Sequence, residues 1–294
     1  MQLFRLFAVI AGVVLAVPNA RATDETASKG RLLARMNWID ARSALTPQAV
    51  VVIPLGAESK EHGPHLPLDT DFRQAEYFKQ RVLAAADVVI APTFNYGFYP
   101  AFVEYPGSTS LSLAVSRDML AEVVRGIARF GPRRFYVINI GVSTNRTLAL
   151  ARALLAQEGI ALAYLDLTGP AVRALERLVE TQQEGTHAEE IETSAMLAID
   201  ETAVDMRRAA VEYMIARGSV RGPFSLEPKS PLYNPSGIYG DATRATAAKG
   251  RFINDGMTQI ILDEIEALRS AALPMTTPTG AASAPSPASS RAVP

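Results

Sequence analysis

The chain has 294 residues, with 29 Lys and Arg against 30 Asp and Glu, a formal net charge of -1, and no cysteine. A balanced charge without a dense basic stripe argues against nucleic acid as a partner. The lack of cysteine excludes disulfides and thiolate ligands, so any metal site must be built from histidine and carboxylate side chains.

Residues 1–22 are typical of an export signal. Arg5 supplies a positive charge, residues 6–17 form a short apolar stretch, and Ala20-Arg21-Ala22 is a cleavage site of small residues. The apolar stretch is too short to span a bilayer as a permanent helix. We therefore expect cleavage after Ala22, no stable membrane span, and a periplasmic or secreted mature chain.

The remaining chain alternates between strand and helix patterns. Short β-branched or aromatic runs predict buried strands at 49–55, 87–92, 134–139 and 160–166. Apolar residues at helical spacing predict helices at 72–86, 114–130, 147–158, 170–181 and 188–199. This alternation predicts a three-layer α/β/α domain with a mostly parallel sheet over residues 23–272. Residues 273–294 are rich in Pro, Ala and Ser and are expected to be a disordered tail.

The loop after the first predicted strand holds two of the three histidines in the chain. His62 and His65 lie in IPLGAESKEHGPHLPLDTDF (53–72), together with Glu58, Glu61 and Asp71. Ligands of open α/β sheets bind beyond the carboxyl ends of the strands, where this loop is expected. Imidazole combined with carboxylate suits Zn, Mn or Fe. From these residues alone, a metal site and a polar surface loop both remain open.

The predicted helix at 188–199 carries acidic residues near its start. Its apolar face consists of Ile191, Ala195, Ala198 and Ile199. At about 100° per residue, Glu192 lies at the edge of this face, whereas Glu190 points to the opposite, solvated side. An unpaired carboxylate beside the core is costly, so a cation or several donors should lie near Glu192.

Four segments resemble the motifs of one known family. KEHGPHLPLDTD (60–71) closely resembles E-x-H-G-x-H-L-P-x-x-x-D of the creatininase family of metal-dependent amidohydrolases. YPGSTSL (105–111), HAEEIETS (187–194) and GIYGDATRATAAKG (237–250) resemble F-P-G-T-x-S-L, H-A-G-x-x-E-T-S and G-x-x-G-D-P-x-x-A-T-x-x-K-G of the same family. The ordered matches extend from about residue 38 to about residue 268. The chain is identified as a divergent, exported member of this family.

The resemblance implies roles for individual residues. His62, Asp71 and Glu192 fall on metal-ligand positions, with Asp71 in the place of a carboxylate that bridges two ions. His187 falls on the histidine thought to carry a proton to the leaving nitrogen, and imidazole titrates in the range this needs. The candidates for substrate binding are His65, Ser143 and Thr144.

The first departure from the family pattern is Lys60, which stands where the family has its first glutamate. Glu58 or Glu61 could take over that ligand position, and Glu61 is preferred because it adjoins His62. Alternatively, the ammonium of Lys60 replaces part of the charge of a missing metal ion.

The second departure is the absence of the family's ligand histidine from the segment 139–145. Ser143, Thr144 or Asn145 could supply a weaker oxygen ligand or contact the substrate. The sequence is therefore compatible with one or two divalent ions. Zinc is the expected metal, with manganese or iron as alternatives.

The resemblance implies a metal-dependent hydrolase that opens a cyclic amide or cleaves a linear one. In this interpretation a metal ion activates water for attack on the carbonyl of a small-molecule amide. The resemblance also implies a homo-oligomer, specifically a hexamer. Two alternatives stay open: hydrolysis of a lactone or ester, and a non-catalytic periplasmic binding or assembly protein with a degenerate metal site.

Overall fold

The structure, a computed structural model, describes residues 28–183, 185–213 and 233–276. The predicted signal segment, residues 1–22, and the predicted tail from residue 277 onward lie outside these ranges. Among the helices of the described ranges, none combines the length and the apolar character needed to cross a membrane.

A parallel sheet forms the middle layer. Its strands are β1 (Arg31–Leu32), β2 (Val50–Leu55), β3 (Val89–Ile90), β4 (Arg134–Asn139) and β5 (Ala161–Tyr164), in the order β1-β3-β2-β4-β5. Each pairing of neighbouring strands in this sheet is parallel. All six residues of β2 are buried, as expected for a strand covered on both faces.

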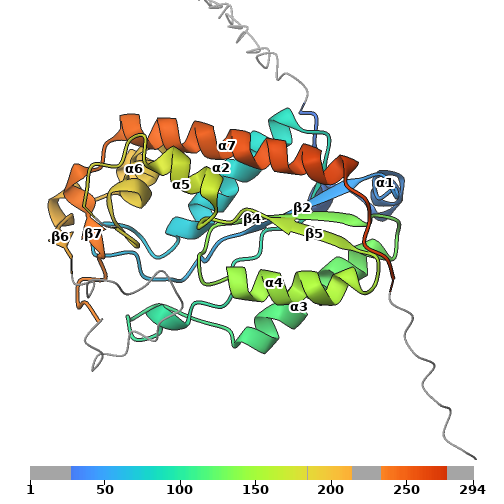
Figure 1. Ribbon diagram of the computed structural model, residues 1–294, viewed down its shortest axis with the longest axis horizontal. Helices are drawn as coiled ribbons and strands as arrows, with labels where there is room; N and C mark the ends of the chain where they lie inside the picture. Colours follow the sequence, from blue (N-terminus) through green and yellow to red (C-terminus); the bar gives the residue numbers. More distant parts are fainter. Residues whose placement is uncertain (1–27, 184, 214–232, 277–294) are drawn as a thin grey trace, which may run out of the picture.

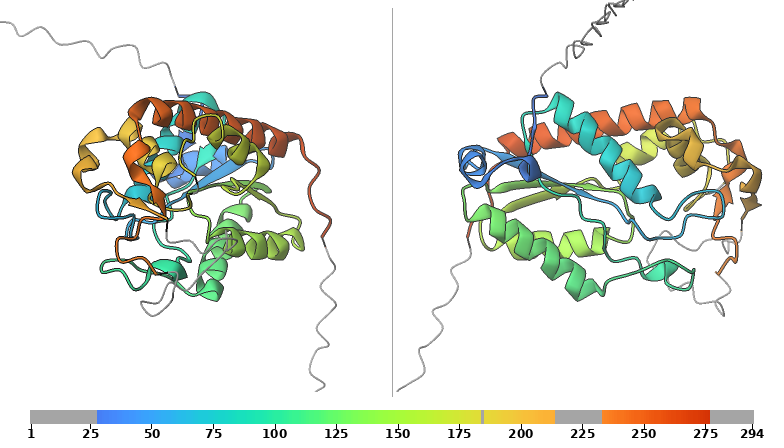
Figure 2. Two further views of the ribbon diagram at one scale, coloured as in Figure 1. Left: turned by 60° about the vertical axis from the view of Figure 1, so that its left-hand side comes forward. Right: turned by 180° about the vertical axis from the view of Figure 1, so that it is seen from behind.

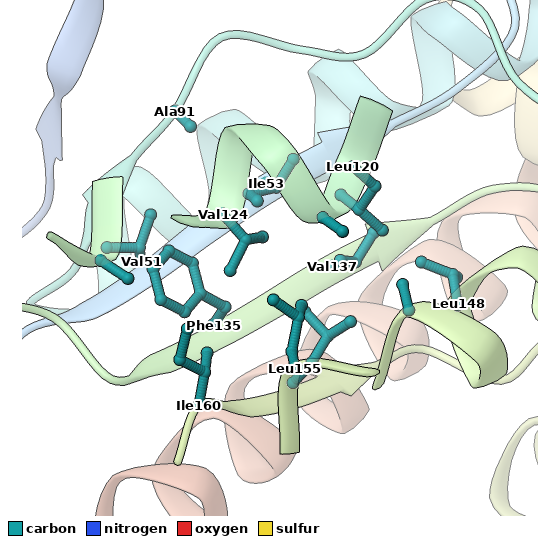
Figure 3. Packing of buried hydrophobic residues seen from close by; sticks show 14 of the residues in the cluster. Val51, Ile53, Ala91, Leu120, Val124, Phe135, Val137, Leu148, Leu155 and Ile160 are labelled. Atoms are coloured by element: carbon teal, nitrogen blue, oxygen red, sulfur yellow. The ribbon is translucent and has the colours of Figure 1, made fainter. Parts of the chain in front are cut away.

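Helices cover both faces of the sheet (Figure 1; Figure 2, right). On one face, Val51 of β2 and Val137 of β4 belong to one buried cluster with Leu120 of α3 (Leu113–Ala128) and Leu148 of α4 (Asn145–Ala156) (Figure 3). The opposite face is covered by α2 (Thr70–Ala85), α5 (Pro170–Glu176), α6 (Glu190–Ile199) and α7 (Ala247–Ser270). The predicted three-layer α/β/α fold is confirmed.

The elements that were not predicted from the sequence include β1, α1 (Trp38–Ala44) and α7. α1 leaves Trp38 and Ile39 largely exposed, so it lacks the clear apolar face that periodicity detects. α7 contains Gly250 and Gly256, and glycine has low helix propensity. Tertiary packing of the apolar face of α7 on the sheet outweighs that low propensity.

Smaller elements complete the described fold. β6 (Val211–Glu212) and β7 (Gly240–Asp241) pair in antiparallel fashion and lie with α6 at one end of the molecule (left in Figure 1). Short 3-10 turns occur at Leu33–Arg35, Pro100–Phe102, Glu201–Ala203, Met206–Arg208 and Ala242–Arg244.

The segment TRATAAKG of the fourth motif docks α7 onto α6. Thr246 caps α7 by accepting a hydrogen bond from the backbone N–H of Lys249, and its own N–H donates to Oγ of Ser194 (3.0 Å). Gly250 lies against the carbonyl of Ser194, where a Cβ would overlap with that oxygen. This motif therefore positions the helix that carries Glu192.

The expectation that Glu190 is solvated is wrong. Its carboxylate is fully buried, pairs with Lys249 of α7, and accepts hydrogen bonds from the backbone N–H groups of Thr181 (2.8 Å) and Gln182 (2.7 Å). Helical periodicity places Glu190 opposite the apolar face of α6, but α7 covers that side of the helix, so the carboxylate is buried there.

Replacing Gly250 by alanine should lower the free energy of unfolding by about 1–3 kcal/mol or more, because the new methyl group forces α7 away from α6. The matched control is Gly126→Ala in α3, where a Cβ meets nothing within 4 Å. That control should raise stability by about 0.5–1 kcal/mol, since alanine is the better helix former. Urea unfolding measures both variants, and equal effects would contradict this account of the α6–α7 contact.

Candidate active site

His62 lies in the loop between β2 and α2, as predicted, and its imidazole is completely buried. Nδ1 lies 2.8 Å from the backbone oxygen of Lys60, and as an N–H it donates to that carbonyl. This contact turns Nε2 toward Oδ1 of Asp71, 2.7 Å away. An imidazole whose Nδ1 donates to a backbone carbonyl is the usual arrangement of a metal-binding histidine.

Asp71, in the first turn of α2, is fully buried and contacts the side chains of Lys60 and His62. Its Oδ2 lies 2.7 Å from Nζ of Lys60, and its Oδ1 faces His62. Burial alone would raise the pKa of this carboxyl, but the charges of Lys60 and His62 and their hydrogen bonds hold the pKa well below its ordinary value. Asp71 is therefore ionised in the folded chain.

His187 and Glu192 reach the same place from the start of α6. Nδ1 of His187 lies 3.4 Å from Oε2 of Glu192, and Oε1 of Glu192 lies 3.5 Å from Nε2 of His62. The rings of His62 and His187 are 5.1 Å apart. Burial raises the pKa of Glu192, but the charges of His62, His187 and Lys60 lower it more. The cationic groups expected beside Glu192 are thus present.

The backbone at Ala188 helps to hold this geometry. Among the non-glycine residues that the structure describes, Ala188 alone has a left-handed φ, 51°. Its N–H donates to Oε2 of Glu192 (2.7 Å), and the preceding His187 pairs with Tyr239 through a backbone bridge. Such strain in a non-glycine residue is typical of functional sites.

Glu61, the preferred replacement ligand, lies beside His187. Nε2 of His187 is 3.0 Å from the backbone oxygen of Glu61 and 3.3 Å from its Oε2. Burial lowers the pKa of His187, but the hydrogen bond to Glu61 and the charges of Glu192 and Glu61 outweigh it and raise the pKa above its ordinary value. Gly237 of the fourth motif contacts Glu61 so closely that a Cβ there would overlap with its carboxylate.

The three predicted substrate-binding residues lie in different environments. His65 is buried and its Nε2 lies 2.8 Å from Oγ1 of Thr193 in α6, a contact that fixes the loop to the helix. Thr144 is buried, and its hydroxyl donates to the backbone oxygen of Gly141 (2.6 Å). Ser143 lines the cavity described next. Only Ser143 of the three is thus placed at a cavity wall, and all three roles stay predictions.

A cavity of about 160 Å³ opens beside these groups. Its walls include Lys60, Phe102, Ser143, His187 and Glu192, together with residues of α5 and α7. Loops that follow the neighbouring strands β2 and β4 both contribute, as expected at the carboxyl edge of a parallel sheet. A molecule bound in this cavity would contact His187, the proposed catalytic histidine, and Glu192, a proposed metal ligand.

Glu189 was not singled out from the sequence, although it also lines the cavity. Burial raises the pKa of Glu189 to about 8. As the cap of α6, its carboxylate accepts hydrogen bonds from the backbone N–H groups of Ile191 and Glu192, which lower the pKa but do not outweigh burial. Glu189 stands where the family motif H-A-G-x-x-E-T-S has glycine. This departure from the motif could have marked Glu189 as a candidate site residue from the sequence alone.

The described residues fit a divalent cation. One atom each from His62, His187 and Glu192 can be chosen such that all three lie within 4.8 Å of one another. Each oxygen of Glu192 faces one of the two imidazoles: Oε2 lies 3.4 Å from Nδ1 of His187, and Oε1 lies 3.5 Å from Nε2 of His62. Imidazole and carboxylate are also the donors that such ions prefer.

A family model described as creatininase, creatinine amidohydrolase, matches residues 34–265. The chain belongs to the creatininase family. Among curated relatives, a mycofactocin precursor peptide peptidase of Mycolicibacterium smegmatis is 31% identical over 232 residues, covering 74% of this chain and 84% of the relative. A creatinine amidohydrolase of Pseudomonas putida is 26% identical over 262 residues, covering 81% and 97%. The chain is therefore a divergent creatininase-family hydrolase.

Solved creatininase structures share the fold. A crystal structure of creatinine amidohydrolase matches with a TM-score of 0.67 and 23% identity, covering 83% of this chain and 100% of that chain. A structure described as creatininase Mn matches with a TM-score of 0.67 at 22% identity, covering 82% and 100%. A mutant creatininase described as Zn-Zn type gives 0.66 at 22% identity, covering 82% and 98%.

The buried His65 should make this creatininase-family chain sensitive to acid. Burial lowers its pKa from 6.5 to about 4, so the unfolded chain takes up the proton first as the pH falls. The contribution of neutral His65 to the free energy of unfolding is therefore fully present above pH 6.5. It is lost as the pH falls from 6.5 to about 4, by up to roughly 3 kcal/mol. Urea unfolding with a chelator present should show a flatter pH dependence for His65→Gln. Parallel curves for parent and variant would rule out this role of His65.

Proposed function

We propose that this chain is a metal-dependent hydrolase that cleaves the C–N bond of a small cyclic or linear amide. The observation that supports it best is that the buried His62 lies close to His187 and Glu192, which line a cavity, with ligand atoms of all three close enough for one ion.

The ion would be held by His62 and Glu192, whose ligand atoms lie close together, and by Asp71, whose Oδ1 lies beside Nε2 of His62. Glu61, the fourth predicted ligand, contacts His187, which is assigned the proton transfer below. Zinc is the proposed metal, with manganese or iron as alternatives. When bound, it supplies a Lewis acid that lowers the pKa of water and polarises a carbonyl oxygen. His62 is already oriented for this task by its contact with the carbonyl of Lys60. Asp71 is held in its ionised form by the cations at its two oxygens.

His187 carries the proton to the leaving nitrogen. It lines the cavity, and its raised pKa keeps a larger fraction of the imidazole protonated near neutral pH, as a proton donor requires. Glu61 orients it, because the backbone oxygen of Glu61 accepts the hydrogen bond of Nε2. Nδ1 is then turned toward Glu192 and the proposed ion site.

The size of the cavity favours a small substrate. About 160 Å³ is below the range of about 300–1,000 Å³ that holds drug-sized ligands. A second candidate, an end residue of a peptide, is favoured by the relative named a precursor peptide peptidase, which is 31% identical. Rates of hydrolysis measured on a panel of cyclic amides, short peptides and lactones show which of these classes the chain accepts.

Replacing Glu192 by glutamine should remove both metal uptake and turnover, since a neutral amide is a poor ligand for a divalent ion. The matched control is Glu266→Gln, an exposed residue of α7, which should keep both. Metal content after dialysis and rates on the substrate panel are the measurements. A folded parent chain that binds no metal and hydrolyses nothing would favour the non-catalytic alternative.

His187→Asn should keep the metal but lose turnover by about 10²–10⁴-fold, the usual contribution of a positioned proton donor. The loss should be smaller for substrates whose leaving group needs no proton, such as activated esters. If the variant loses its metal instead, His187 is a ligand and not the proton carrier.

A further inference from the structure

The ammonium of Lys60 is enclosed by protein groups beside the proposed ion site. The residue is 5% exposed, and Nζ lies 2.7 Å from Oδ2 of Asp71. Nζ also lies 4.9 Å from the centre of the Phe102 ring and 5.6 Å from that of Tyr99. A carboxylate and two aromatic faces are the surroundings that stabilise a buried cation.

The two oxygens of Asp71 therefore have separate partners. Oδ1 faces His62, which belongs to the group of residues that fit a metal ion. Oδ2 faces the ammonium of Lys60. A carboxylate that bridges two ions offers one oxygen to each, and here a side-chain cation already takes one of these places.

The second departure from the family pattern lies on the same side. Gly141, in the segment that lacks the family's histidine, lines the cavity together with Lys60. A Cβ on Gly141 would lie 3.2 Å from the ring of Tyr99, the ring that also contacts the Lys60 ammonium. Both departures thus lie against the ring of Tyr99, and the ammonium of Lys60 also faces Oδ2 of Asp71. His62 and Glu192 lie on the side of Oδ1.

The charges agree with a single ion. Three carboxylates surround the imidazoles, those of Asp71, Glu61 and Glu192, and Lys60 supplies one positive charge among them. With both imidazoles counted as neutral, the remaining charge of about -2 equals that of one divalent ion with opposite sign. A second ion would place an excess of positive charge beside the buried ammonium, which is unfavourable at low dielectric.

We propose that Lys60 is a built-in cation that takes the place of a second metal ion, so that this centre binds one divalent ion on the Oδ1 side of Asp71. The proposal rests on the proposed metal-dependent function. It makes Lys60 a positioning residue, which holds the carboxylate of Asp71 in place for the single ion.

The test is the number of ions per chain, measured on the whole protein. The chain is stripped with a chelator, dialysed against Mn²⁺ or Zn²⁺, and analysed for bound metal by mass spectrometry. The parent should bind one ion per chain, and its Mn²⁺ form should give the electron paramagnetic resonance signal of an isolated ion. Lys60→Glu should take up a second ion and give an exchange-coupled Mn²⁺ signal. The control Lys29→Glu, at an exposed position, should behave like the parent.

The outcomes separate this proposal from the function on which it rests. Two ions per parent chain with a coupled Mn²⁺ signal would overturn the single-ion centre while leaving a metal-dependent hydrolase intact. A folded parent that binds no ion would overturn both. A folded Lys60→Glu variant that still binds one ion would also overturn the proposal, because the removal of the ammonium should open the second position.

Discussion

The buried carboxylate of Asp71 is the charge on which the arrangement of the site depends. Burial disfavours its ionised form, and cations at both oxygens, Lys60 on one side and His62 on the other, offset that cost. These contacts fix the loop before α2 and aim His62 at Glu192. Removing one partner of such a buried pair usually costs about 3–5 kcal/mol. The charge arrangement and the folding of the loop are therefore coupled.

A second constraint acts through the long helix α7. Its start is attached to α6 by Thr246, by the pair of Lys249 with Glu190, and by the close approach of Gly250. None of these residues touches the cavity at its ion side, yet together they hold α6 and so Glu192. The fourth motif is thus explained by helix packing, although it resembles the family as closely as the motifs that carry the chemistry.

Membership of the creatininase family shows the fold of this chain and its class as a hydrolase. The relatives are named for a precursor peptide and for creatinine, which are different kinds of substrate. Members of the family therefore choose their substrates through side chains that differ at the site, while the fold is shared. In this chain three departures from the family motifs lie at the cavity, whose wall includes Lys60, Glu189 and residues 140–143 of the segment that lacks the family's histidine.

The sequence by itself determined the alternation of strands and helices and the parallel sheet, because hydrophobic periodicity is a local property of the chain. The grouping of His62, Asp71, His187 and Glu192 was predicted from the resemblance of four segments to the family motifs. Only the tertiary structure decided that Lys60 faces Asp71 and that α7 buries Glu190, because both contacts join side chains whose meeting depends on how separate elements pack. A helical wheel gives the direction of a side chain, but it does not give the element that covers it.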